Sequence, residues 1–160
     1  PNAGKSTLIS RLTRAHPEIA EYPFTTKQPC LGIVELKSHD RERFVIADIP
    51  GIIEGAHRGK GMGLDFLRHI SRTKVILLLL DILDNPEVAY NTLLKELSQY
   101  DESLLKRPRI VALNKIDSAD ETLINKDWRE HFPDEEIHLI SAVASDGLSK
   151  LVSRLAELVF

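Results

Sequence analysis

Three short motifs bring together residue types that bind a nucleotide and a metal ion. They are NAGKS at residues 2–6, DIPG at residues 48–51 and NKID at residues 114–117. A loop with lysine and serine suits phosphates, a strand-end aspartate suits magnesium, and a carboxylate suits the N–H edge of a purine base. Together the three motifs predict that the ligand is GTP with magnesium.

The first motif contains the second half of the phosphate-loop pattern G-x-x-x-x-G-K-[ST], whose first glycine would stand before residue 1. Backbone N–H groups of such a loop, together with the start of the next helix, attract phosphates. Lys5 would add a point charge and the Ser6 hydroxyl a magnesium ligand. Taken alone, the motif is equally compatible with a chance Gly-Lys-Ser before an ordinary helix. The predicted phosphate contacts are Pro1, Asn2, Ala3, Gly4, Lys5, Ser6 and Thr7.

The second motif follows an apolar run. The Asp48 carboxylate would hold magnesium through water, and the N–H of Gly51, after Ile49 and Pro50, would reach the γ-phosphate. An isolated aspartate at a strand end is more often a cap, so this prediction depends on the joint spacing of the motifs.

A threonine pair in YPFTT, residues 22–26, falls in a loop that would pass over the phosphates. One hydroxyl is needed to complete the magnesium shell, and we favour Thr26 over Thr25, with Phe24 also contacting the nucleotide. The predicted catalytic residues are Lys5, Thr26 and Gly51, and the predicted metal ligands are Ser6, Thr26 and, through water, Asp48.

The third motif would select the base. Guanine offers two neighbouring N–H donors, both of which the Asp117 carboxylate can accept, whereas adenine presents an acceptor that would be left unpaired. Asn114 would also bond guanine, and the Lys115 stem would pack beside the sugar. A backbone N–H near the guanine oxygen would come from the loop Ser141, Ala142 and Val143.

Apolar runs alternate with helical patterns along the chain. The runs are mostly not alternating in polarity, which indicates strands covered on both faces. Predicted strands cover residues 31–36, 44–47, 75–80, 110–113 and 137–140, and predicted helices cover 5–14, 64–71, 86–100, 121–131 and 148–158.

The segment between the first two predicted strands, residues 39–42, is short and polar. It predicts a hairpin and therefore one antiparallel edge strand in an otherwise parallel sheet. The result is a three-layer α/β/α sandwich, with the strand before the phosphate loop absent from this chain. Asn85 before Pro86 predicts a side-chain cap at the start of a helix.

The composition suits one globular domain, with 42% hydrophobic residues in 160. Cys30 is the single cysteine, which favours a reducing compartment such as the cytoplasm. A net charge of −3 gives no strong field for nucleic acid. The longest apolar run, residues 75–80, is far shorter than the roughly 20 residues of a membrane span.

The segment after the second motif holds five glycines in residues 51–63. Glycine loses the most backbone entropy on ordering, so this loop is either a plain surface connection or a switch that a ligand or partner orders.

These segments resemble the GTPase domain of the Obg family of P-loop GTPases. The resemblance is carried by the phosphate and base motifs, by YPFTT at 22–26, by DIPGIIEGA at 48–56, and by GMG and FLRH at 61–63 and 66–69. It implies that residues 1–160 form an Obg-type, Ras-like G domain that is incomplete at its N-terminus. It also implies a cytoplasmic GTPase that acts in assembly of the large ribosomal subunit. We further expect a monomer without a membrane partner.

Ile52 occupies the position where many GTPases place a glutamine that orients water. Its side chain has no hydrogen-bonding group, so we predict slow intrinsic hydrolysis and help from another residue, a cation or a partner. Asn2 stands where related GTPases without the glutamine ligate potassium; otherwise it stabilises the loop. Two other functions stay open here: a scaffold that binds guanine nucleotide without hydrolysis, and a P-loop kinase for a small acceptor.

Overall fold

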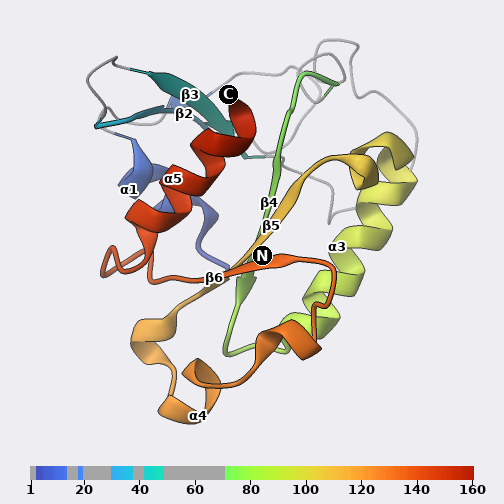
Figure 1. Cartoon of the computed structure of the whole chain (residues 1–160), viewed down its shortest axis with the longest axis vertical. Helices are drawn as coiled ribbons and strands as arrows, with labels where there is room; N and C mark the ends of the chain where they lie inside the picture. The colour runs from blue at the N-terminus through green and yellow to red at the C-terminus, as the bar shows by residue number, and fades with distance from the viewer. Residues whose placement is uncertain (1–2, 14–17, 20–29, 38–41, 49–70) are drawn as a thin grey trace.

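The computed structural model describes residues 3–13, 18–19, 30–37, 42–48 and 71–160 (Figure 1). The strands are β1 (Glu18–Ile19), β2 (Cys30–Glu35), β3 (Arg43–Ala47), β4 (Ile76–Asp81), β5 (Arg109–Asn114) and β6 (Glu136–Leu139). The α-helices are α1 (Lys5–Leu12), α3 (Pro86–Tyr100), α4 (Glu121–Ile124) and α5 (Leu148–Val159). Short 3-10 helices are η2 (Glu102–Lys106), η3 (Ile116–Ser118) and η4 (Trp128–Glu130).

The described strands form two sheets of three strands each, in the orders β1-β2-β3 and β4-β5-β6. The first sheet is antiparallel throughout, and the predicted hairpin is seen in the register that pairs Leu31 with Ala47 and Glu35 with Arg43. The second sheet is parallel, with Asp81 opposite Asn114 at its carboxyl end. We expected one mostly parallel sheet, but β3 and β4 share no hydrogen-bonded ladder in the described residues. The strand β1, which is only two residues long, was not predicted.

The parallel sheet is covered on both faces, as its apolar strands predict. Successive residues of β5 point to opposite sides, so Val111 and Leu113 enter one core and Ile110 and Ala112 the other. The first core packs against α3 and η4, and the second packs against α1 and α5 (Figure 1). This arrangement confirms the three-layer sandwich.

Helix α1 connects the two sheets. Its Leu8 shares the second core with Val34 of β2 and Leu79 of β4. The approach to β2 is closest at Gly32, where an added Cβ would lie 2.2 Å from Thr13 Cγ2 and 3.0 Å from Ile9 Cγ2. Only glycine therefore lets this helix lie so near the strand.

Some local predictions were wrong. The predicted helix over residues 121–131 is broken into α4 and η4, because the Asp127 side chain accepts a hydrogen bond from the Arg129 N–H and starts a new turn. Helix α1 ends at Leu12, since Thr13 is extended. Asn85 precedes α3 in a left-handed conformation (φ 42°) and makes no side-chain cap; its carbonyl accepts from the helix instead. Of the predicted helix over 64–71, only Ser71 is described.

The carboxyl ends of β4, β5 and β6 meet at one edge of the parallel sheet, next to the start of α1. Loops at such an edge are the usual place for a ligand in α/β folds. No helix within the described ranges combines the length and apolar character that a membrane crossing requires.

Candidate functional site

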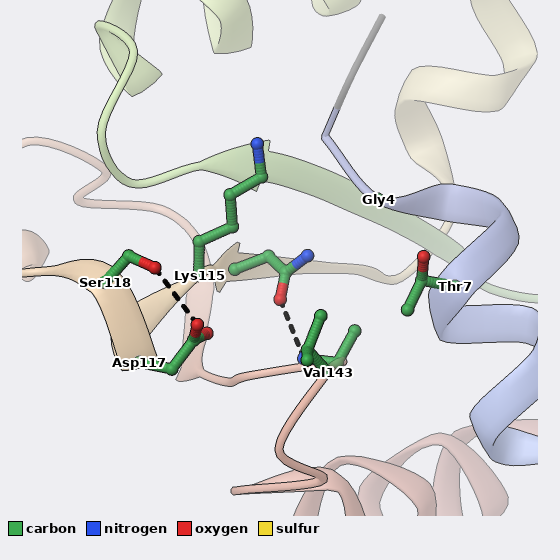
Figure 2. Close-up of a pocket in the computed structure, with 8 residues that line it drawn as sticks. Gly4, Thr7, Lys115, Asp117, Ser118 and Val143 are labelled. Atoms are coloured by element: carbon green, nitrogen blue, oxygen red, sulfur yellow. Dashed lines mark hydrogen bonds between the residues drawn. The ribbon is translucent and has the colours of Figure 1, made fainter.

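A pocket of about 360 Å³ lies at this edge of the sheet (Figure 2). Three segments far apart in sequence form its walls: the start of α1, the turn after β5, and the loop between β6 and α5. Asp117 and Ser118 lie on one side, and Gly4 and Thr7 on the other (Figure 2). The lining residues are Gly4, Thr7, Asn114, Lys115, Asp117, Ser118, Ala142 and Val143.

Asn114 connects the three walls. The residue is 3% exposed, and its Nδ2 donates to the carbonyl of Ala3 at 2.8 Å. Its Oδ1 accepts from the Ala142 N–H at 2.9 Å. One amide thus fixes the phosphate loop and the β6–α5 loop to the end of β5, which gives Asn114 a structural role besides the predicted contact with guanine.

Gly4 is required by this contact. Its φ of 95° is left-handed, and an added Cβ would lie 2.6 Å from Asn114 Nδ2. Both the conformation and the space therefore restrict the position to glycine. The glycine of the motif lets the loop approach the end of β5.

Lys115 is held by a residue of the neighbouring strand. Its backbone is left-handed, with φ 74°, and its Nζ lies 2.5 Å from Asp81 Oδ2. The other oxygen of Asp81 accepts from the Leu83 N–H at 2.9 Å. The ion pair fixes the turns after β4 and β5 to each other, and the contact of the lysine stem with the sugar stays a prediction.

The Asp117 carboxylate is exposed at the pocket, and each of its oxygens accepts a serine hydroxyl. Ser141 Oγ donates to Oδ1 at 2.6 Å, and Ser118 Oγ donates to Oδ2 at 3.1 Å. The hydrogen bond from Ser141 is the main cause that lowers the pKa of Asp117, and the bond from Ser118 adds to it. The carboxylate is therefore an acceptor at neutral pH, as recognition of guanine N–H groups requires.

Lys5 and Asp48 lie together on the phosphate side of the site. Lys5 Nζ is 3.0 Å from Asp48 Oδ1, and the side chains are 43% and 15% exposed. This Asp48 oxygen is buried, and among the described residues the Lys5 ammonium is the one group shown against it. Ser6 is exposed at the first turn of α1. Carboxylate and hydroxyl oxygens are the ligands that a hard cation such as magnesium prefers, so the chemistry of Asp48 and Ser6 fits this ion.

The structure thus brings together the start of α1, Asp48 and the third motif. The loop Ser141–Val143 is also in place, with one difference from the prediction. The N–H groups of Ser141 and Ala142 donate within the protein, to the Asp146 carbonyl and to Asn114, rather than facing a ligand. The predicted contacts that lie outside the described residues are Pro1, Asn2, Phe24, Thr25, Thr26, Ile49, Pro50 and Gly51.

Sequence reasoning missed two residues of this site. Asp81 ends a strand directly opposite Asn114, so a strand-end carboxylate next to the base motif was the available signal. Ser118 directly follows the motif, and the hydroxyl of a serine next to Asp117 was the signal in the sequence for this hydrogen bond.

The fold and the motifs that line the pocket are those of a P-loop GTPase domain. The chain belongs to a family described as 50S ribosome-binding GTPase, and the match to this family covers residues 1–115. The Obg resemblance is confirmed by curated relatives named GTPase Obg. The relative from Salinibacter ruber is 51% identical over 99% of this chain and 48% of its own length. The relative from Acaryochloris marina is 50% identical over 98% of this chain and 45% of its own length. The chain spans less than half the length of these relatives.

Solved structures show the same fold at low sequence identity. A mutant of NFeoB from S. thermophilus, bound to GDP, has a TM-score of 0.71 at 24% identity and covers 99% of this chain and 59% of its own. The G domain of the T. maritima FeoB iron transporter has a TM-score of 0.68 at 22% identity and covers 100% and 94%. These likenesses confirm the Ras-like G-domain architecture.

Proposed function

We propose that this GTPase domain is a magnesium-dependent switch that acts on the large ribosomal subunit. The observation that carries the nucleotide assignment is the exposed Asp117 carboxylate, whose two oxygens are held at the mouth of a pocket by Ser141 and Ser118. Two fixed acceptors match the two neighbouring N–H donors of guanine and mismatch adenine. Asn114 and Lys115 support this pairing by fixing the loops around the base.

On the phosphate side, Lys5 would meet the outer phosphates and Ser6 would contribute a hydroxyl to magnesium. The ion pair that holds the Asp48 carboxylate against Lys5 at the start of α1 supports a role for this carboxylate in holding the ion through water. When bound, magnesium would neutralise the charge on the phosphates. Thr26 and Gly51 stay predicted contacts of the γ-phosphate.

Intrinsic hydrolysis by this domain is slow in our proposal, because Ile52 provides no group to orient water. A partner, another residue or a cation must supply that function. Potassium ligated by Asn2 is one source, and its test is the rate of phosphate release in potassium compared with sodium at equal ionic strength.

The ribosomal role rests on family membership and on the relatives named GTPase Obg. We propose that the protein acts as a monomer in the cytoplasm, and that its output is a change of loop conformation between the GTP and GDP states. The ribosomal role is tested by sedimentation of the protein with purified large ribosomal subunits. Binding that is stronger with a GTP analogue than with GDP is expected, and equal weak binding in both states would contradict the proposal.

The nucleotide assignment is tested by competition of GTP, GDP and ATP against a fluorescent GDP. Displacement by both guanine nucleotides and not by ATP is expected. Displacement by ATP would contradict the assignment of Asp117. Phosphate release measured with and without ribosomal subunits then separates a GTPase from a scaffold: turnover that no partner raises above the basal rate would favour the scaffold.

A further inference from the structure

Ser118 lies beside the base-recognition carboxylate, and none of the three motifs includes it. It is the last residue of η3, and its N–H donates to the Lys115 carbonyl at 3.0 Å, which fixes its backbone next to Asp117. Its hydroxyl donates to Asp117 Oδ2 at 3.1 Å, and the residue lines the pocket (Figure 2).

The two hydroxyls act on different oxygens of one carboxylate. An exposed aspartate can rotate about its last side-chain bond, and a single hydrogen bond from Ser141 to Oδ1 leaves the second oxygen free to move around it. The bond from Ser118 to Oδ2 fixes that second oxygen and hence the plane of the carboxylate. A carboxylate has about four lone-pair sites, so each oxygen keeps one for a ligand.

We propose that Ser118 is a positioning residue for base selection, which holds the Asp117 carboxylate in the plane that a two-bond pairing with guanine requires. The inference rests on the proposed guanine contact of Asp117. A two-bond pairing depends on the orientation of the plane, whereas a single hydrogen bond tolerates its rotation. Removing the hydroxyl should therefore affect a base with two donors more than a base with one.

Inosine diphosphate is the probe that separates these cases, because hypoxanthine keeps the ring N–H and lacks the amino group of guanine. The experiment measures the affinities of GDP and inosine diphosphate for the full-length protein and for its Ser118→Ala variant. We expect the variant to lose about three- to tenfold in GDP affinity and less than about twofold in inosine diphosphate affinity. The preference for guanine should fall accordingly.

Two further variants serve as controls. Ser118→Thr keeps a hydroxyl at the same position and should restore the preference for GDP. Ser153→Ala removes an exposed hydroxyl of α5 that donates to the Ser149 carbonyl at 3.0 Å, and it should change neither affinity. Because Ser118 is exposed, its truncation leaves no buried group unpaired, and the variant should fold.

An equal loss for both nucleotides would show a general structural role and overturn the inference. Unchanged affinities in Ser118→Ala would also overturn it, while tight GDP binding by the unaltered protein would leave the proposed function standing. If the unaltered protein does not bind GDP, the proposed function fails and this inference fails with it.

Discussion

Replacement of Asn114 by alanine tests whether one amide holds the pocket together. The change removes two hydrogen bonds. In one, Asn114 Nδ2 donates to the Ala3 carbonyl at 2.8 Å; in the other, Asn114 Oδ1 accepts from the Ala142 N–H at 2.9 Å. Ala142 is 2% exposed, so its N–H would lose its partner without access to water, at about 1–3 kcal/mol. Ala3 is half-buried and can bond water instead, which limits its loss to about 1 kcal/mol. Local stability should fall by about 2–4 kcal/mol in total.

Hydrogen exchange at the Ala142 amide measures this loss where it occurs. A fall of about 2–4 kcal/mol should speed exchange by about thirty- to several-hundredfold. Asn114→Asp is the matched variant: it keeps an acceptor for the Ala142 N–H but turns a carboxylate oxygen toward the Ala3 carbonyl. It should therefore preserve protection of the Ala142 amide while weakening GDP binding. Exchange at Ala142 that is as slow in Asn114→Ala as in the unaltered protein would refute the reasoning.

Three other changes have defined outcomes. Gly4→Ala places a Cβ 2.6 Å from Asn114 Nδ2 at a left-handed φ of 95°, and it should destabilise the protein by about 1–2 kcal/mol in urea unfolding and weaken GDP binding. Asp81→Asn removes the charge that lies 2.5 Å from Lys115 Nζ, and GDP should dissociate several-fold faster in stopped flow, with no further loss when Lys115→Met is added. Burial, then a hydrogen bond donated to Glu135, raise the pKa of Tyr90 from 10.0 to about 12. Since the unfolded tyrosine ionises first, the stability that this proton contributes is complete below pH 10 and lost between pH 10 and 12. The stability advantage of the unaltered protein over Tyr90→Phe, measured by urea unfolding across that range, should shrink as pH rises.

Each of these predictions has an outcome that contradicts it. A Gly4→Ala protein of unchanged stability would mean that the loop relaxes around the new side chain. Additive effects of Asp81→Asn and Lys115→Met would mean that the two residues act independently. A constant difference between the unaltered protein and Tyr90→Phe up to pH 12 would mean that the tyrosine proton is not linked to folding.

The parallel strands could be predicted from the sequence because strands buried on both faces are continuous apolar runs. In β5, Ile110 to Leu113 are all buried, and alternate residues serve two different cores. Propensity failed over residues 121–131, where Asp127 starts a new turn. Local sequence patterns could not predict the division of the described strands into two sheets, because strand pairing depends on contacts between residues distant in sequence.

At the site, residue types and spacing predicted which segments meet but not how their polar groups pair. The Asn-Lys-x-Asp motif predicted a base site, and the pocket contains Asn114, Lys115 and Asp117. The motif carries no information on Asp81, which reaches Lys115 only because β4 and β5 lie in register. A backbone N–H of the loop 141–143 was expected near guanine; that of Ala142 donates to Asn114, a pairing set by tertiary geometry.

The close approach at Gly32 leaves α1 no room to lie nearer to β2. A single methyl group added at Gly32 would already overlap Thr13 Cγ2, and packed interiors transmit strain rather than absorb it. The start of α1 lines the pocket. On the same strand as Gly32, the Cys30 carbonyl accepts a hydrogen bond from the Asp48 N–H at 2.9 Å. Packing at Gly32 therefore couples the start of α1 to the end of the hairpin that carries Asp48, on the phosphate side of the site.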